Sequence, residues 1–295
     1  MQERHLTLRN GRRVSLAEYG DAAGMPVFAL HGTPGSRLKF SSIAPAATRH
    51  GLRIIAPDRW GYGDTDAVRR PTLSGYAADI LELADRHGIE RFALLGISGG
   101  GPYAAVAANL AGERLTRLAL VSPVGPVRLT EPREISRFHR FCFLALPHLP
   151  LLPRAAFEAF RLLLACAPAT ALRLSTAASV DRQVLRNANH RRAFVETFRL
   201  GFTRSAQGPA LDVTAFAGSW EIASHPAGQA RLWIGSNDLN VPVAAARTLA
   251  HLTGAHLVEL PAAGHYWFSE HHDAVLGWLA ESAERSETIV PSAQV

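Results

Sequence analysis

The sequence predicts an α/β fold with a mostly parallel sheet and a block of helices inserted into it. Short runs that are apolar at successive positions alternate with helical patterns in the first half of the chain and again near its end. Strands that are apolar on both faces are typical of buried parallel sheets, and their alternation with helices favours right-handed crossovers. Between the two parts, residues 127–208 show helical patterns separated by prolines and no clear strand pattern.

The expected strands follow from apolar runs and turn signals. Residues 4–9 and 12–19 predict a hairpin, because Asn10-Gly11 between them is a strong turn dipeptide. Six further strands are expected in the apolar runs at residues 27–30, 52–56, 91–97, 115–121, 230–234 and 256–260.

The expected helices lie between these strands. Thr72 can begin a helix that runs to His87, with apolar residues on one face and Gly88 as its stop signal. Other helical patterns cover residues 100–111, 131–146, 154–174, 179–203, 242–253 and 271–284. We therefore divide the chain into a core of residues 1–126 and 209–284, a helical insertion of residues 127–208, and a tail of residues 285–295 that we expect to be disordered.

The charged composition excludes several kinds of chemistry. The 295 residues include 31 Lys and Arg against 25 Asp and Glu, a net charge of +6, yet Lys39 is the only lysine. No glycine-lysine pair exists, so a phosphate-binding P-loop is excluded, and any Schiff-base mechanism would have to use Lys39. Because the arginines are spread along the chain and no nucleic-acid-binding module is recognisable, we expect no nucleic-acid partner.

The remaining composition predicts a soluble cytoplasmic protein. We expect a monomer or a homodimer, and the sequence does not decide between them. Cys142 and Cys166 lie in apolar sequence, which favours buried thiols over a disulfide framework. The N-terminus lacks the pattern of a secretory signal. The longest apolar stretch, residues 141–152, is interrupted by prolines and is shorter than the roughly 20 residues of a membrane span, so we expect no stable membrane insertion.

The strongest chemical signal is the segment Gly96-Ile97-Ser98-Gly99-Gly100. It fits the pattern G-x-S-x-G between an expected strand and an expected helix. Such a turn holds its serine in a strained conformation, so the residues two before and two after it must be small. The following helix N-terminus stabilises developing negative charge. We therefore expect Ser98 to be a nucleophile.

A nucleophilic serine needs a base and a group that orients the base. His265 and Asp238 each follow an expected strand, at the ends where open α/β sheets place their sites, and they occur in the order serine, aspartate, histidine. Of the competing acids, Asp212 and Glu221 fall in an expected helix, where capping or salt bridging explains them better. We expect Asp238 to orient His265.

An oxyanion hole requires two backbone N–H donors. Gly99 follows the nucleophile and supplies one, and Thr33, in the loop after the strand at 27–30, is expected to supply the other. In the same loop, His31 is interpreted as a structural histidine. The Asp58-Arg59 pair is expected to brace the sheet edge or this loop.

Five motifs together resemble the α/β-hydrolase superfamily, in the branch of proline iminopeptidase-like enzymes, esterases and epoxide hydrolases. The resemblance covers about residues 5–283 and is weakest at 127–208, where that family carries a variable helical cap. It rests on the stretches His31-Gly-Thr-Pro-Gly-Ser36, Asp58-Arg-Trp-Gly-Tyr-Gly63, Gly96-Ile-Ser-Gly-Gly-Gly-Pro102, Gly235-Ser-Asn-Asp238 and Gly264-His265.

The resemblance implies an α/β-hydrolase fold with a mostly parallel eight-stranded sheet and a Ser98–His265–Asp238 triad. A serine at position 98 argues against epoxide hydrolases and haloalkane dehalogenases, which use aspartate. Trp60 departs from the proline usual in the second motif, and we expect it to shape the pocket wall. The other expected substrate-binding residues are Phe141, Phe143, Tyr266 and Trp267.

The expected function is hydrolysis of a small ester, lactone, thioester or amide with an apolar group, through an acyl-enzyme. No cofactor is expected and no metal, because the adjacent residues of Glu270-His271-His272-Asp273 point to different helix faces. The alternatives are a proline iminopeptidase-like aminopeptidase, a lyase or carbon–carbon bond hydrolase that uses the same triad, and a non-catalytic binding protein. The aminopeptidase would need a carboxylate from the insertion, where the candidates are Glu131, Glu134, Glu158, Asp181 and Glu196.

Overall fold

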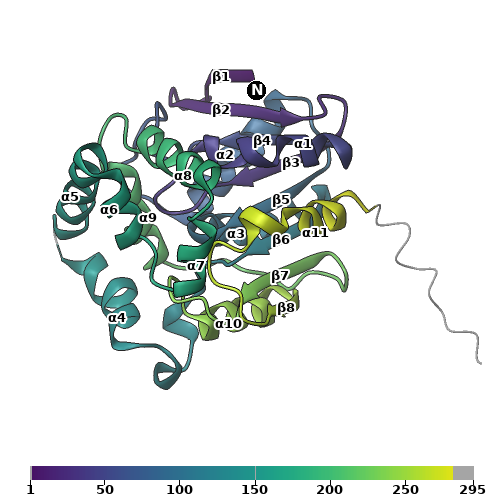
Figure 1. The fold of residues 1–295 in the computed structure, drawn as a ribbon. Coiled ribbons are helices and arrows are strands. Elements are labelled where there is room, and N and C mark those ends of the chain that lie inside the picture. Colours follow the sequence, from purple (N-terminus) through teal and green to yellow (C-terminus); the bar gives the residue numbers. More distant parts are fainter. Residues whose placement is uncertain (1, 150, 282–295) are drawn as a thin grey trace, which may run out of the picture.

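The computed structural model describes residues 2–149 and 151–281, which form an α/β structure around one twisted sheet (Figure 1). Eight strands of this part of the chain are hydrogen-bonded in the order β1-β2-β4-β3-β5-β6-β7-β8. The strands are β1 (Gln2–Thr7), β2 (Arg13–Gly20), β3 (Met25–Leu30), β4 (Leu52–Pro57), β5 (Phe92–Ile97), β6 (Leu115–Val121), β7 (Ala230–Gly235) and β8 (His256–Leu260).

The sheet is parallel from β4 to β8 and antiparallel at its first edge. The β1–β2 hairpin turns at Gly11, whose φ of 81° is a conformation that glycine adopts without strain. The parallel strands run through the centre of the molecule (Figure 1), and their carboxyl ends all lie at the same end of the sheet. The expected strands are confirmed, each within a few residues.

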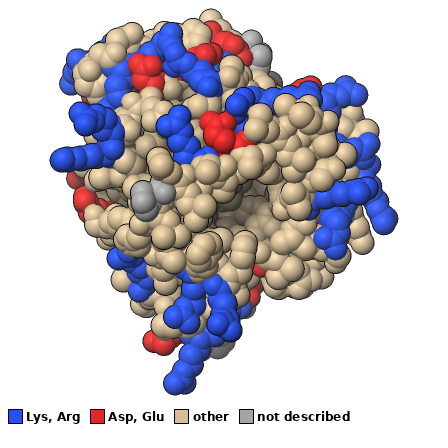
Figure 2. Space-filling model, turned by 90° about the vertical axis from the view of Figure 1, so that its left-hand side faces the viewer, with Lys and Arg blue, Asp and Glu red and all other residues tan. Residues whose placement is uncertain are grey.

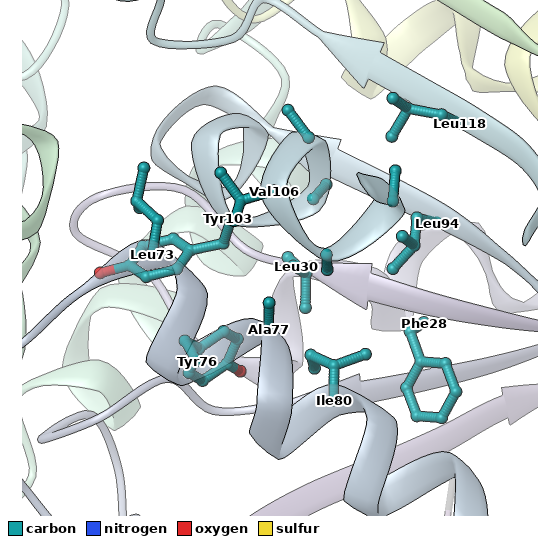
Figure 3. Close-up of a cluster of buried hydrophobic side chains, with 14 of the residues drawn as sticks. Phe28, Leu30, Leu73, Tyr76, Ala77, Ile80, Leu94, Tyr103, Val106 and Leu118 are labelled. Carbon is teal, nitrogen blue, oxygen red and sulfur yellow. The ribbon is translucent and has the colours of Figure 1, made fainter. Parts of the chain in front are cut away.

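Two apolar layers sandwich the sheet. On one face pack α2 (Leu73–Arg86), α3 (Gly101–Ala111) and α10 (Val243–Thr253), and on the other pack α1 (Ala44–Arg49) and α11 (Phe268–Ala280). Successive side chains of a strand point to opposite faces of the sheet. In β3, Phe28 and Leu30 therefore face α2 and α3, while Val27 and Ala29 belong to the other layer. Figure 3 shows Leu30, Leu94 and Ile80 within the first layer.

Helices fill the segment between β6 and β7. They are α4 (Arg137–Arg140), α5 (Leu152–Cys166), α6 (Pro168–Leu174), α7 (Ser179–Val184), α8 (Ala188–Gly201) and α9 (Gln207–Phe216). Figure 1 shows α4, α5, α6 and α8 beside the sheet rather than against one of its faces. Leu164, Leu172, Phe194 and Phe198 give them a small apolar core of their own.

The structure corrects several expectations about the helices. The helix expected at residues 131–146 is interrupted, with the short α4 followed by a π-helical turn over Phe141–Ala145 and a 3₁₀ turn that contains Pro147. Proline removes a backbone donor and ends the regular helix. The helix expected at 271–284 already begins at Phe268. The expected disordered tail at 285–295 lies outside the described residues.

The expectation of two buried thiols is wrong. Cys142 is half-buried and Cys166 is exposed, and both are free. Cys166 follows the buried Leu164 by two positions in α5, and such neighbours lie on different sides of a helix. No helix within residues 2–149 and 151–281 combines the length and the apolar character needed to cross a bilayer.

Candidate active site

The turn that carries Ser98 is the most constrained part of the site. Ser98 lies directly after β5 with a φ of 53°, a left-handed conformation that costs energy for a residue with a side chain. A Cβ atom at Gly96 would lie 2.7 Å from the Cβ of Ala104 and 2.8 Å from the Gly100 carbonyl oxygen. Glycine at position 96 therefore lets α3 follow closely behind the serine. The turn presents the Ser98 hydroxyl at the end of β5.

His265 and Asp238 approach this hydroxyl from the loops after β8 and β7. The Ser98 hydroxyl donates to Nε2 of His265 at 3.0 Å, and Nδ1–H of His265 donates to Oδ2 of Asp238 at 2.7 Å. The other carboxylate oxygen of Asp238 accepts from the N–H groups of Asn240 at 2.9 Å and Val241 at 3.1 Å. The three residues therefore form one hydrogen-bonded chain, and Asp238 is held by its own loop.

The environment of His265 tunes its basicity. Burial acts to lower the pKa of His265, but the negative charge and the hydrogen bond of Asp238 outweigh it and raise this pKa above its ordinary value of 6.5. A raised pKa makes the neutral imidazole of His265 a better proton acceptor.

Asp181 connects the helices between β6 and β7 to the loop that carries His265. It lies in α7 and is fully buried, and its carboxylate accepts the backbone N–H groups of His265 at 3.0 Å and Tyr266 at 2.8 Å. A side chain at Gly264 would collide with this carboxylate. The sequence offered Asp181 only as a possible ligand of a substrate amino group, and no local pattern indicates its role as a support for His265.

The loop after β3 places Thr33, the second expected oxyanion donor, against Gly99. A Cβ atom on Gly99 would lie 3.1 Å from the backbone nitrogen of Thr33, so the two residues are in close contact. Among the hydrogen bonds of the described residues, the N–H groups of Thr33 and Gly99 have no acceptor. Both donors are therefore available beside the Ser98 hydroxyl.

A buried ion pair holds this loop in place, as expected for Arg59. The Arg59 guanidinium donates to the carbonyl oxygens of His31 and Gly32, at 3.1 Å for the latter, and to Oδ2 of Asp212 at 2.6 Å. Asp212 also accepts from the Thr33 hydroxyl at 2.5 Å. Asp212, which lies in α9, thus forms a salt bridge with Arg59, as expected. Glu221 lies beyond the end of that helix rather than inside it.

His31 has a structural role, as expected. Its Nδ1–H donates to the Gly32 carbonyl at 2.9 Å, and its Nε2 accepts from the Arg59 N–H at 3.2 Å. Burial, and then the positive charge of Arg59, lower the pKa of His31 well below its usual range. Both ring nitrogens of His31 are thus engaged within the loop and with Arg59, which leaves neither nitrogen free to act as a base.

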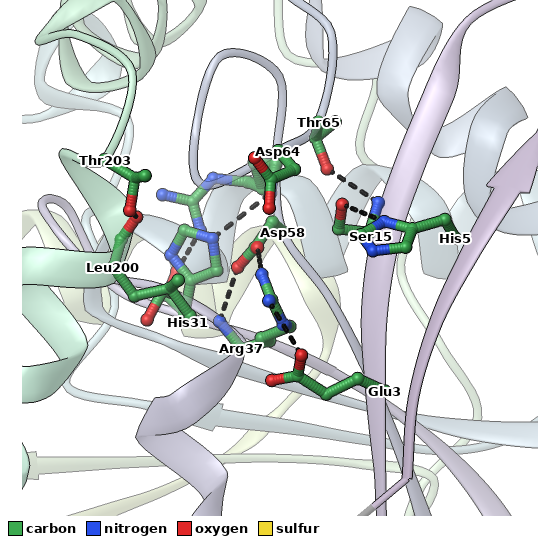
Figure 4. A network of polar contacts seen from close by, with 12 residues as sticks. Glu3, His5, Ser15, His31, Arg37, Asp58, Asp64, Thr65, Leu200 and Thr203 are labelled. Atoms are coloured by element: carbon green, nitrogen blue, oxygen red, sulfur yellow. Dashed lines mark hydrogen bonds and ion pairs between the residues drawn. The ribbon is translucent and has the colours of Figure 1, made fainter.

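A second polar network supports the chain just beyond this loop (Figure 4). The Asp58 carboxylate accepts from the backbone N–H of Arg37 at 2.6 Å and pairs with the Arg37 guanidinium, which also reaches Glu3 at 3.3 Å. Burial raises the pKa of Asp58 to about 6 against the opposing effect of Arg37. The network fixes the start of the 3₁₀ helix Arg37–Ile43.

Ser98 and His265 open onto a cavity of about 500 Å³. Its wall comes from the loops at the carboxyl ends of the strands and from the helices between β6 and β7. The lining residues are mainly aliphatic and aromatic. The aromatic members are Phe138, Phe143, Phe157, Phe160, Phe194, Phe198, Phe216, Tyr266 and Phe268. Figure 2 shows a hollow in the face formed by these helices, with a rim that is mostly neither acidic nor basic.

The structure places two of the five expected substrate-binding residues in this wall, Phe143 and Tyr266. Trp60 is directed away, because its indole is buried against α2 and donates to Asp79 at 2.7 Å. Trp267 is likewise buried in the core beneath α11, where it donates to Ser122 at 3.1 Å. Phe141 is 47% exposed and lies outside the cavity wall. Side-chain direction in loops and in a π-helical turn cannot be read from local sequence.

A family model of the alpha/beta hydrolase fold matches residues 25–272. The chain belongs to this family. The matching curated relatives include the non-heme chloroperoxidase of Streptomyces lividans, 32% identical over 41% of this chain and 45% of the relative, and epoxide hydrolase A of Mycobacterium tuberculosis, 28% identical over 43% and 41%. The chain therefore spans less than half the length of these members of the family.

Solved structures match over nearly the whole chain. A hydrolase from Pseudomonas aeruginosa has a TM-score of 0.67 at 20% identity, with 94% of this chain and 97% of that chain covered. Epoxide hydrolase A from Mycobacterium thermoresistibile has a TM-score of 0.69 at 23% identity, with 95% and 97% covered. At these identities the similarity establishes the α/β-hydrolase fold alone.

Proposed function

We propose that this protein is a serine hydrolase that cleaves a small ester, lactone, thioester or amide, with esters as its preferred substrates. The observation that carries the proposal is the hydrogen-bonded chain from Asp238 through His265 to Ser98, which ends at the wall of a mostly apolar cavity. That chain has the arrangement that activates a serine hydroxyl.

The reaction proceeds through an acyl-enzyme. Ser98 Oγ attacks the substrate carbonyl while Nε2 of His265 takes its proton, and the N–H groups of Thr33 and Gly99 donate to the oxyanion. His265 then gives the proton to the leaving alcohol, thiol or amine. A water molecule that His265 deprotonates attacks the acyl group in turn and releases the acid and free Ser98.

An aminopeptidase is less well supported, because it needs a carboxylate near the substrate amino group. No Asp or Glu lines the cavity among the described residues. Asp181 already accepts two backbone N–H groups, Glu158 accepts from Ala206 and Arg161, and the other three candidates are exposed.

The relatives suggest one further candidate that uses the same triad. A Bacillus subtilis relative, 31% identical over 44% of this chain and 48% of its own length, is named as a putative 2-succinyl-6-hydroxy-2,4-cyclohexadiene-1-carboxylate synthase. A lyase or carbon–carbon bond hydrolase would keep Ser98 and His265 but would act poorly on simple esters. Epoxide hydrolysis is disfavoured because Ser98 stands where that mechanism requires aspartate.

The test is hydrolysis of 4-nitrophenyl acetate, butyrate and octanoate by the full chain. We expect turnover that falls by at least about 10³-fold in Ser98→Ala, while the exposed Ser42→Ala variant serves as a matched control and keeps wild-type rates. Undiminished hydrolysis by Ser98→Ala would overturn the proposal. Failure of the wild type on all three esters would favour the lyase or the binding protein.

A further inference from the structure

The only lysine of the chain lies in the wall of the catalytic cavity. Lys39 is in the 3₁₀ helix Arg37–Ile43, and it lines the same cavity as Ser98 and His265. The Asp58 carboxylate holds the first residue of that helix by its backbone N–H. The position of the lysine is therefore fixed by the core rather than by a mobile surface segment.

The ammonium group of Lys39 has no anionic partner in the described part of the chain. Within residues 2–149 and 151–281 no carboxylate forms an ion pair with it, and no hydrogen bond from Nζ is present. Nζ instead contacts the ring of Phe194 in α8, whose centroid lies 4.4 Å away. A cation–π contact of this kind is modest and leaves the charge without a counter-ion.

The surroundings make this unpaired charge unusual. Among the described residues that line the cavity, Lys39 is the only Lys, Arg, Asp or Glu. Burial lowers the pKa of Lys39 to about 8, so the group remains mostly protonated at neutral pH despite the apolar wall. A charge that is kept in an apolar cavity without a partner would be stabilised by an anion that enters from outside.

Lys39, Ser98 and His265 line one cavity, so a single bound molecule can contact all three. The positive charge of Lys39 is one of the influences on the pKa of His265, which it tends to lower. An anionic group bound at Lys39 would therefore belong to the molecule whose carbonyl reaches Ser98. Aliphatic and aromatic residues of the wall would contact the hydrocarbon between these two ends.

We propose that Lys39 is a specificity-determining residue that binds a carboxylate of the substrate, so that the enzyme acts on carboxylate-bearing esters or lactones. A carboxylate fits better than a phosphate, because a single ammonium without an arginine fork matches one negative charge. This inference rests on the proposed acyl hydrolysis. It names the substrate class at the same site.

The experiment compares two esters that differ in one charge, mono-4-nitrophenyl adipate and its methyl-capped diester, at pH 7. We expect the wild type to favour the anionic ester, and Lys39→Met to lower the ratio of the two kcat/KM values by about 10- to 100-fold, as for a charge-assisted hydrogen bond. Lys39→Arg should retain part of the preference. Arg192→Met, exposed on the same α8 that carries Phe194, removes an equal charge and should leave the ratio unchanged.

Two outcomes of the kinetic comparison would overturn the inference. An unchanged ratio in Lys39→Met would mean that the lysine only packs on Phe194, and a wild type that prefers the capped diester would mean that the cavity excludes carboxylates. A binding measurement distinguishes failure of the Lys39 inference from failure of the hydrolase proposal. In Ser98→Ala, calorimetry should show tighter binding of hexanoate than of hexanamide, and Lys39→Met in that background should abolish the difference. Equal binding of the two ligands in Ser98→Ala would refute the role of Lys39 whether or not any ester is cleaved.

Discussion

The buried Asp212 helps to hold the loop after β3, which carries the proposed oxyanion donor Thr33. Asp212 is 1% exposed, and its carboxylate accepts from the Thr33 hydroxyl at 2.5 Å, the Tyr62 hydroxyl at 2.6 Å and the Tyr103 hydroxyl at 2.8 Å. The same carboxylate is the counter-ion of Arg59, which is also buried. Asp212→Asn keeps the shape of the side chain but removes its charge and one of its two acceptor oxygens.

The expected loss of stability follows from the uncompensated guanidinium. Removing one partner of a buried ion pair costs about 3–5 kcal/mol in the free energy of unfolding. For a domain of this size 1 kcal/mol corresponds to about 2–4 °C, so Asp212→Asn should lower Tm by roughly 6–20 °C. Ester turnover at a permissive temperature should also fall, because Arg59 and Asp212 position the Thr33 N–H.

Differential scanning calorimetry of the wild type and the variant measures this effect. Asp85→Asn is the matched control, because it breaks a surface pair with Arg114 that is worth less than about 1 kcal/mol. The double variant Arg59→Met/Asp212→Leu removes both charges and should recover much of the lost stability. A Tm for Asp212→Asn within about 3 °C of the wild type would refute the role assigned to this ion pair.

Three further predictions concern the catalytic loops. Because His265 must be neutral to accept the serine proton and its pKa is raised above 6.5, a pH–rate profile should show kcat/KM falling as the pH drops through a midpoint above 6.5. Asp238→Asn should move that midpoint to lower pH, since it removes the charge that raises the pKa, and should lower kcat by about 10⁴-fold; an unmoved midpoint would contradict this. Asp181→Ala should reduce the free energy of unfolding by about 1–3 kcal/mol for each backbone N–H left unpaired, and kcat should fall with it, whereas chemical denaturation curves that coincide with the wild type would rule out the anchoring role. Gly100→Ala should cost about 1–3 kcal/mol by overpacking against the carbonyl of Leu30, and an equally stable variant would show that the turn tolerates a side chain.

The parts of the fold that could be predicted are those in which local sequence carries the signal. β5, for example, is buried along its whole length, so its six residues are all apolar and are followed by a glycine-rich turn. The loops that carry Asp238 and His265 were found for the same reason, because each follows a recognisable strand.

The parts that could not be predicted depend on side-chain direction or on distant partners. Tyr266 and Trp267 are adjacent, yet one faces the cavity and the other the core, because the loop backbone turns between them. Arg59 and Asp212 are separated by about half the chain, so no local pattern reveals that they pair. Lys39 was conspicuous as the only lysine, but its place in the cavity wall emerges only when the loop after β3 meets α8.

The measurement that tests the central claim most directly is the site of covalent modification by a fluorophosphonate. Trypsin releases the segment from Phe92 to Arg114 as one peptide, and Ser98 is its only serine. Mass spectrometry of the labelled, folded protein should place the phosphonyl adduct on Ser98, and Asp238→Asn should slow its formation. A folded protein that forms no adduct, or that is labelled elsewhere while Ser98 remains unmodified, would contradict the assignment of Ser98 as an activated nucleophile.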